Sequence, residues 1–218
     1  IVHICRFSDL ERIAWDPDGR AALIARAFWP GPLTMILKKK DTVPMETTGG
    51  LSTVAVRFPS HPAAQGLIAA AGGFVAAPSA NTSGKPSPTS ARYVAEDMDG
   101  RIDMILDGGD VGIGLESTIL DLTEDEPMIL RPGYVTQEML EEVLGRVSVD
   151  RTILDAASDR RPKAPGMKYR HYAPKGELAV VEGEPGRVTL RINELCQKAA
   201  AEGKKTGVIA ADETAPLY

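Results

Sequence analysis

"TVAVRFPSHPAAQGLIAAAGGFVAAPSANTSGKPSPTSA", residues 53–91, contains the signals of a strand, a helix and a second strand in succession. Residues 53–58 alternate apolar and polar side chains, which predicts a strand with one buried face. Residues 62–72 predict a helix, and the apolar residues 74–78 predict the next strand. This order favours an α/β or mixed α+β domain.

The neighbouring segments repeat this alternation. We predict strands at residues 1–5, 33–40, 103–107, 117–122 and 127–131. A helix is expected after Asp16 and Pro17, with four side chains on one face: Ala21, Ile24, Ala25 and Phe28. Ser90 and Thr136 are expected to cap helices that end near Asp97 and Gly145. The domain formed by residues 1–149 is therefore expected to contain a mixed sheet.

Composition excludes several classes of protein. The 218 residues are 43% hydrophobic with a net charge of −5, which is typical of a folded chain and argues against extended non-specific binding of nucleic acid. Cys5 and Cys196 are far apart, so neither a disulfide framework nor a zinc site is expected, and we predict both to be buried. No segment has the length and apolarity of a membrane span or a signal peptide, so a cytoplasmic protein is expected.

Residues 150–174 lack periodicity and form an expected linker. Residues 159–175, which we call the strap, contain one acidic residue, Asp159, and three interleaved aromatic or imidazole side chains, Tyr169, His171 and Tyr172. They also contain six basic residues: Arg160, Arg161, Lys163, Lys168, Arg170 and Lys175. Such a strap could clamp a nucleotide by charge and stacking, or it could be a solvated tether.

Residues 175–218 predict the beginning of a second α/β domain. A strand in 176–183 and another in 206–212 flank a helix whose apolar face carries Ile192, Leu195, Cys196 and Ala199. One βαβ unit buries little core by itself, so we expect this domain to be truncated. The first strand likewise suggests a chain cut at its beginning.

Two segments carry candidate ligand groups. Ser79, Asn81, Lys85 and Ser87 follow a strand, at the end where open sheets bind ligands, although the same residues suit an Asx turn with a solvated lysine. Residues 108–118 are glycine-rich and could approach an anion or form a plain turn. Arg131 could fork onto a phosphate or lie on the surface. Three histidines, His3, His61 and His171, are too few to suggest a metal site or a Ser-His-Asp triad.

Together these segments resemble a known family. "IVHI", "STVAVRFPSHP", "APSANTSGKPSPT", "GLESTILDL", "ILRPG" and "PGMKYRHYAP" are similar, in order and spacing, to the two-domain threonylcarbamoyl-AMP synthases, which are YrdC-like enzymes. The resemblance implies a twisted mixed sheet flanked by helices around a concave basic cavity, followed by a linker and a Rossmann-like domain.

The family's reaction is what the resemblance implies for this chain. L-Threonine, bicarbonate or CO₂, and ATP give threonylcarbamoyl-AMP and pyrophosphate, with no tightly bound cofactor and with Mg²⁺ accompanying ATP. The product is passed to the machinery that makes threonylcarbamoyl-adenosine in tRNA. Such a nucleotidyltransferase needs orientation and charge neutralisation rather than a single catalytic residue.

The resemblance also implies roles for individual residues. L-Threonine would be bound by His3, Arg57, Ala77 and Ser117. ATP would be held by Thr53, Ser79, Asn81, Ser87 and Arg131, and Arg170, His171 and Tyr172 of the strap would close over it. The family's lysine- and arginine-bearing segment lies upstream of Ile1, and we expect a molecule without it to be inactive.

Two other functions remain open at this stage. A non-catalytic RNA-binding or ribosome-maturation protein could use the same scaffold, although the net acidity and the strap argue against it. A carbamoyl-adenylate module of hydrogenase maturation is less consistent with the sequence, because the zinc-finger and acylphosphatase-like segments expected beside it are not visible.

Overall fold

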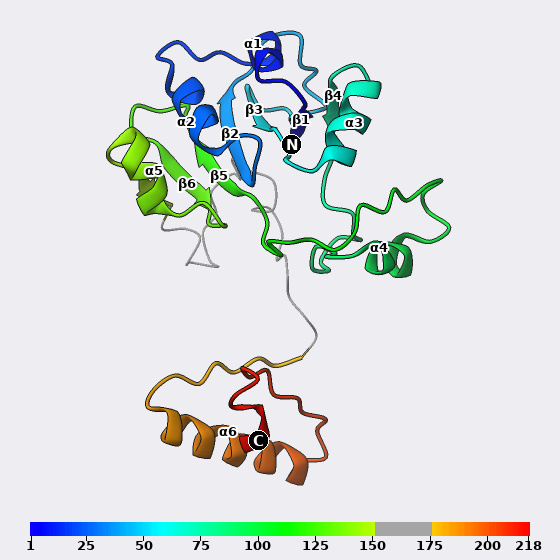
Figure 1. Cartoon of the computed structure of the whole chain (residues 1–218), viewed down its shortest axis with the longest axis vertical. Coiled ribbons are helices and arrows are strands. Elements are labelled where there is room, and N and C mark those ends of the chain that lie inside the picture. The colour runs from blue at the N-terminus through cyan, green and yellow to red at the C-terminus, as the bar shows by residue number, and fades with distance from the viewer. Residues whose placement is uncertain (151–175) are drawn as a thin grey trace. The chain divides into compact units, whose positions relative to one another are not determined.

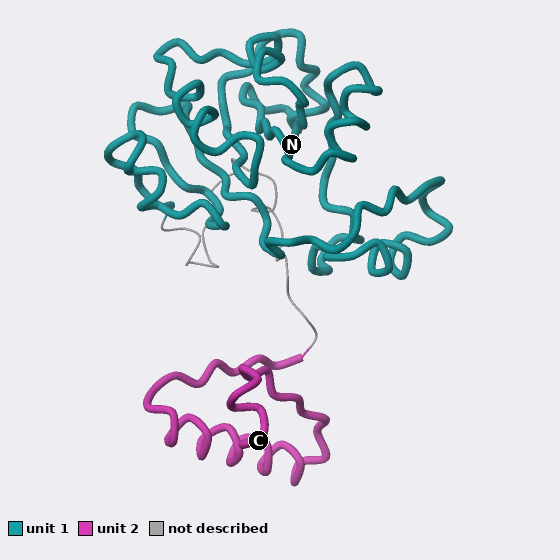
Figure 2. Tube along the Cα trace, in the orientation of Figure 1, with its two compact units in different colours: residues 1–173 teal, residues 174–218 magenta. Residues whose placement is uncertain are grey.

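The computed structural model describes residues 1–150 and 176–218. The chain divides into two compact units, Ile1–Ala173 and Pro174–Tyr218 (Figure 2). The expected boundaries at residues 149 and 174 stay a prediction, because residues 151–175 are not described.

The first unit is built on a seven-stranded mixed sheet (Figure 1). Its strands are β1 (Val2–Ile4), β2 (Leu33–Lys38), β3 (Thr53–Arg57), β4 (Phe74–Ala76), β5 (Thr118–Asp121), β6 (Met128–Arg131) and β7 (Ser148–Val149). They lie in the order β4-β1-β3-β2-β5-β6-β7. The pairs β1–β3, β2–β5 and β6–β7 are parallel and the other three are antiparallel, so the predicted mixed sheet is confirmed.

Helices connect these strands. They are η1 (Phe7–Asp9), α1 (Leu10–Ile13), α2 (Arg20–Phe28), α3 (Pro62–Ala70), α4 (Ala91–Met98) and α5 (Gln137–Leu144). The Asp16 carboxylate accepts the N–H groups of Ala21 and Ala22 and so fixes the start of α2. Thr136 caps α5 by accepting the N–H of Met139, as predicted. Ser90 stands at the N-cap of α4, but its hydroxyl makes no capping hydrogen bond.

The two faces of the sheet have different surroundings. On β2, Leu33, Met35 and Leu37 belong to the main apolar core, which also contains residues of β1, β3, α1, α2 and α5. Side chains alternate along a strand, so Thr34 and Ile36 of β2 lie on the other face. This second face carries only a small apolar cluster of Ile36, Ile119 and Leu130, and it is the face on which the polar residues of β1 and β3 lie.

One predicted strand of the first unit is absent. Residues 103–107 form no strand, and the side chains of Met104 and Leu106 are exposed. Their apolar run is local, whereas a strand also requires a neighbour to pair with. The short strand β7 was not predicted; it forms because Ser148 and Val149 pair with β6.

The second unit, as far as it is described, contains α6 (Pro185–Ala201) and the short helix η3 (Ala215–Leu217). The predicted helix is confirmed, and it begins after Glu184, which accepts the N–H of Arg187. The strands predicted at 176–183 and 206–212 are wrong: neither segment pairs with another, and Leu178 and Ile209 are exposed. Two parallel strands with no further strands beside them bury too little apolar surface to be stable.

Two further observations concern the whole described chain. Within residues 1–150 and 176–218, no helix has the length and apolarity to cross a membrane. Cys5 and Cys196 are unpaired, and both are half-buried rather than buried as predicted.

Candidate functional site

Five neighbouring strands contribute one residue each to a single row across the sheet. His3 of β1 lies opposite Arg57 of β3, and Arg57 lies opposite Thr34 of β2. Thr34 is paired in turn with Ile119 of β5, and Ile119 with Arg131 of β6. Directly paired side chains emerge on the same face, so residues from distant parts of the sequence become neighbours.

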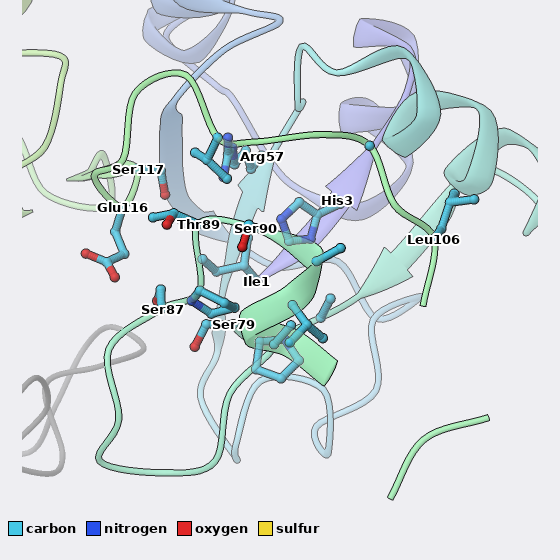
Figure 3. Close-up of a pocket in the computed structure, with 18 of the residues that line it drawn as sticks. Ile1, His3, Arg57, Ser79, Ser87, Thr89, Ser90, Leu106, Glu116 and Ser117 are labelled. Atoms are coloured by element: carbon cyan, nitrogen blue, oxygen red, sulfur yellow. The ribbon is translucent and has the colours of Figure 1, made fainter. Parts of the chain in front are cut away.

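A cavity of about 780 Å³ lies beside this row. Its volume is in the range of small-molecule sites. The loop after β4, the start of α4 and the segment before β5 complete its walls (Figure 3). All four residues predicted to bind threonine line it, as do three of those predicted to bind ATP: His3, Arg57, Ala77, Ser117, Ser79, Ser87 and Arg131. In Figure 3, Ser79 and Ser87 lie toward one end of the opening and Arg57 and His3 toward the other.

Arg57 presents an uncompensated positive charge. Val54 and Val56 alternate with it and are buried in the core, so its side chain lies on the cavity face, as the strand pattern predicts. Its Nε donates to the carbonyl of Gly31 at 3.1 Å, which leaves the terminal N–H groups of the guanidinium for a ligand. Burial and, next, the charge of Arg131 lower the pKa of Arg57, and no described carboxylate forms an ion pair with it. Such a group favours an anion.

His3 is neutral at pH 7. Burial and, next, the charge of Arg57 lower its pKa to about 4. Its Nδ1 is buried and has no hydrogen-bond partner among the described residues. The neutral ring beside Arg57 therefore contributes polar character to the cavity lining without adding charge.

Arg131 holds Ser117 by two hydrogen bonds. Its Nε donates to the Ser117 carbonyl and its Nη2 to the Ser117 hydroxyl, each at 3.0 Å. The Ser117 hydroxyl also lies 2.7 Å from the hydroxyl of Thr34. Gly133 makes this close packing possible, because a Cβ there would lie 2.5 Å from the carbonyl oxygen of Glu116. The two arginines thus lie on either side of a hydrogen-bonded pair of hydroxyls.

The loop between β4 and α4 is held by its own polar groups. Asn81 Nδ2 donates to the carbonyls of Thr82 and Lys85 at 3.0 Å each. Asp97 of α4 accepts the N–H and the hydroxyl of Thr82 and forms an ion pair with Lys85. Lys85 first and Thr82 next lower the pKa of Asp97 to about 2. Asn81 and Lys85 thus hold the loop together and neither lines the cavity, but the loop is not the expected Asx turn, because Asn81 Oδ1 accepts no hydrogen bond from the described residues.

Ser87 also lines the cavity. Its hydroxyl oxygen is buried and has no hydrogen-bond partner among the described residues. An unsatisfied buried hydroxyl is costly, so it favours a polar partner that the described residues do not supply.

Among the described residues, one further predicted ATP-binding residue is not brought to the cavity. Thr53 begins β3, four residues from Arg57 and paired with Lys38, so it does not line the cavity. At ~3.3 Å per residue, the two residues are roughly 13 Å apart along the strand. Arg170, His171 and Tyr172 lie outside the described residues.

Several lining residues were missed by sequence reasoning. Thr89 and Ser90 at the start of α4 belong to the lining, as do the acidic side chains of Glu46, Asp107 and Glu116. Among the described lining residues, the expected basic character therefore comes from Arg57 and Arg131. No group of three or more metal-ligating side chains is gathered within residues 1–150 and 176–218.

Comparison with known proteins agrees with this arrangement. The family model Sua5/YciO/YrdC, described as "Telomere recombination", matches residues 1–133, and the model "Threonylcarbamoyl-AMP synthase, C-terminal domain" matches residues 135–217. The chain belongs to the Sua5/YciO/YrdC family. The resemblance inferred from the six sequence segments is confirmed.

Curated Sua5/YciO/YrdC relatives include two long matches. The threonylcarbamoyl-AMP synthase of Pyrococcus abyssi is 51% identical over 209 residues, which are 96% of this chain and 61% of that protein. The enzyme of the same name from Bacillus subtilis is 47% identical over 219 residues, 100% of this chain and 62% of that protein. The chain thus spans about three fifths of the length of these relatives.

Solved structures of the Sua5/YciO/YrdC family are also similar. The crystal structure of P. abyssi Sua5 complexed with L-threonine matches with a TM-score of 0.89 at 49% identity, covering 97% of this chain and 63% of that one. The crystal structure of E. coli YciO matches with a TM-score of 0.52 at 25% identity, covering 61% of this chain and 66% of that one. The mixed α/β fold is therefore confirmed.

Proposed function

We propose that the protein is an L-threonylcarbamoyladenylate synthase. It joins L-threonine, CO₂ or bicarbonate, and ATP into threonylcarbamoyl-AMP and releases pyrophosphate. The observation that carries this proposal is Arg57, a guanidinium with no ion-pair partner among the described residues, which lies beside a neutral histidine in one cavity with Ser79, Ser87 and Arg131. The similarity to P. abyssi Sua5, which was solved with L-threonine, supports the same assignment.

The threonine side of the proposal rests on Arg57 and His3. A guanidinium binds a carboxylate through two parallel hydrogen bonds, so Arg57 fixes one end of the amino acid. The amine must lose a proton before it attacks CO₂, and a neutral His3 does not oppose its approach by charge. The amine nitrogen forms a bond to the carbon of CO₂ while one C–O π bond opens onto oxygen, and the nitrogen releases a proton to water, which gives a carbamate.

The nucleotide side rests on Arg131 and the serines. A carbamate oxygen attacks the α-phosphorus, the bond to the β-phosphate oxygen breaks, and pyrophosphate leaves with its electrons. Negative charge grows on the phosphate oxygens, and Arg131 is placed to neutralise it. Ser79 and Ser87 supply hydroxyl donors, and Mg²⁺ enters as part of the ATP substrate. Positioning is the main contribution of the protein.

The proposal includes a partner for the product. The product is a mixed carbamic–phosphoric anhydride, which hydrolyses readily and must therefore be used soon after its release. In this proposal it is consumed by the machinery that transfers the threonylcarbamoyl group to tRNA. A cytoplasmic location is part of this proposal, because ATP and tRNA are both available there.

Pyrophosphate release tests the proposed function. The protein is incubated with ATP, Mg²⁺, bicarbonate and each amino acid in turn, and the nucleotide product is weighed by mass spectrometry. We expect pyrophosphate only with threonine and bicarbonate together, and a product whose mass is that of threonylcarbamoyl-AMP. Pyrophosphate release without threonine, or tight binding of structured RNA with no release, would contradict the proposal and favour the RNA-binding alternative.

A further inference from the structure

Thr34 is a buried polar residue in a mostly apolar strand. It lies on the central strand β2, is fully buried and does not line the cavity. Its neighbours on β2, Leu33 and Met35, are buried apolar residues. Valine has nearly the same shape, and a buried hydroxyl costs free energy unless it is hydrogen-bonded. The hydroxyl of Thr34 is therefore expected to have a hydrogen-bond partner, and that partner indicates why threonine stands here instead of valine.

That partner is the hydroxyl of Ser117, 2.7 Å away, which does line the cavity. Ser117 already receives one hydrogen bond from Arg131 Nη2. A hydroxyl has one proton and two acceptor sites, so two arrangements remain. In the first arrangement Thr34 donates to Ser117, and the Ser117 hydroxyl can donate a hydrogen bond into the cavity. In the second arrangement Ser117 donates to Thr34 and has no proton left for a ligand.

The charge of the site decides between them. Arg57 and Arg131 flank these hydroxyls and favour an anionic ligand group, whose oxygens only accept hydrogen bonds. With both acceptor sites of Ser117 filled, by Arg131 and Thr34, its remaining proton is directed to that group.

We propose that Thr34 is a positioning residue that donates to Ser117 and keeps the Ser117 proton available to the carboxylate of L-threonine. This inference rests on the proposed function. In this arrangement Arg57 and Ser117 bind the same carboxylate in different ways. Arg57 supplies positive charge, and Ser117 supplies an oriented hydroxyl donor.

Three substitutions test the inference. Thr34→Val keeps the shape and removes the hydroxyl, whereas Thr34→Ser keeps the hydroxyl. Thr118→Val is the matched control, because Thr118 is also fully buried and its hydroxyl donates to the carbonyl of Val135, in the segment between β6 and α5. We expect Thr34→Val to raise the KM for threonine about tenfold, the effect of one hydrogen bond to a charged group, with the KM for ATP unchanged within about twofold. Thr34→Ser should restore the wild-type value, and Thr118→Val should show no selective loss of threonine affinity.

A double-mutant cycle separates positioning from packing. If Thr34 acts through Ser117, then Thr34→Val has no further effect on the threonine KM in a Ser117→Ala background. Should Thr34→Val fail to fold, Thr34→Cys takes its place with the same expectation, because a thiol is a weak donor.

The outcomes distinguish this inference from the proposed function. If the unsubstituted protein binds no threonine in a calorimetric titration, the proposed function and this inference both fall. If it binds threonine and Thr34→Val binds equally well, or if the effects of Thr34→Val and Ser117→Ala simply add, this inference alone is overturned.

Discussion

His3 and Arg57 lie directly opposite each other on the parallel strands β1 and β3, and the charge of Arg57 contributes to the low pKa of His3. The pair combines a permanent cation with a ring that stays neutral at physiological pH. An amino acid presents a carboxylate beside an amine, and this pair of side chains can serve both. The predictions below follow from this arrangement and from its neighbours in the row.

Arg57→Ala should weaken threonine binding far more than ATP binding. A two-pronged hydrogen bond to a carboxylate contributes roughly 1.5 to 3 kcal/mol, which corresponds to a KM for threonine about ten- to hundredfold higher. Steady-state pyrophosphate release measures both KM values. Arg92→Ala is the control, since Arg92 is exposed and pairs with Glu96 of the same helix. Unchanged threonine affinity in Arg57→Ala would remove Arg57 from the threonine site.

The low pKa of His3 predicts a pH dependence of stability. The pKa of His3 is about 4 in the folded protein and about 6.5 in the unfolded chain, so the unfolded state gains the proton first as the pH falls. His3 therefore stabilises the fold above pH 6.5, and this contribution is lost as the pH falls from about 6.5 toward 4.

Urea unfolding at pH 7 and pH 5 measures this effect. These conditions lie above the range in which most carboxylates titrate. The free energy of unfolding should fall more between pH 7 and pH 5 in the wild type than in His3→Gln. Equal losses in the two proteins would show that His3 titrates normally.

Arg131→Lys and Arg131→Ala should have different consequences. Lysine keeps the charge but lacks the planar fork that contacts both the carbonyl and the hydroxyl of Ser117. We expect Arg131→Ala to raise the KM for ATP at least tenfold and Arg131→Lys to raise it only severalfold. Calorimetry with ATP and with threonine distinguishes this from unfolding, because a folding defect would abolish both kinds of binding in both variants.

Asp97→Asn should impair the nucleotide end of the cavity. The Asp97 carboxylate holds Thr82 and Lys85, and thereby the loop that carries Ser79 and Ser87. We expect a severalfold higher KM for ATP with the threonine KM unchanged. Glu96→Gln, at the adjacent and more exposed acid, is the matched control. If the two variants behave alike, the Asp97 contacts do not position the loop.

Local patterns in the sequence predicted the parts of the site that depend on one element. Alternation in residues 53–58 was enough to place Arg57 on the face opposite Val54 and Val56, and part of the polar loop after residue 78 lines the cavity, although its contact with a ligand stays a prediction. Asn81 shows the limit of such reasoning, since an amide that holds its own loop and a ligand-binding amide have the same local signature.

Features that depend on pairing could not be predicted. The row from His3 to Arg131 exists because β2 lies between β3 and β5, and β5 follows β2 only after about eighty residues. The role of Thr34 was missed for this reason, since a lone threonine in an apolar strand carries no signal until its partner is known. The strand predicted at residues 103–107 was wrong for the opposite reason: the segment has an apolar run typical of a strand, but no neighbouring strand pairs with it.

A crystal structure of the protein with L-threonine would show whether the row of β1, β3 and β2 forms a site for the amino acid. We expect the carboxylate within hydrogen-bond distance of the terminal nitrogens of Arg57 and of the Ser117 hydroxyl, with the amine toward His3. Threonine bound away from this row, or with its carboxylate at Ser79 and Ser87 and no contact to Arg57, would contradict this expectation.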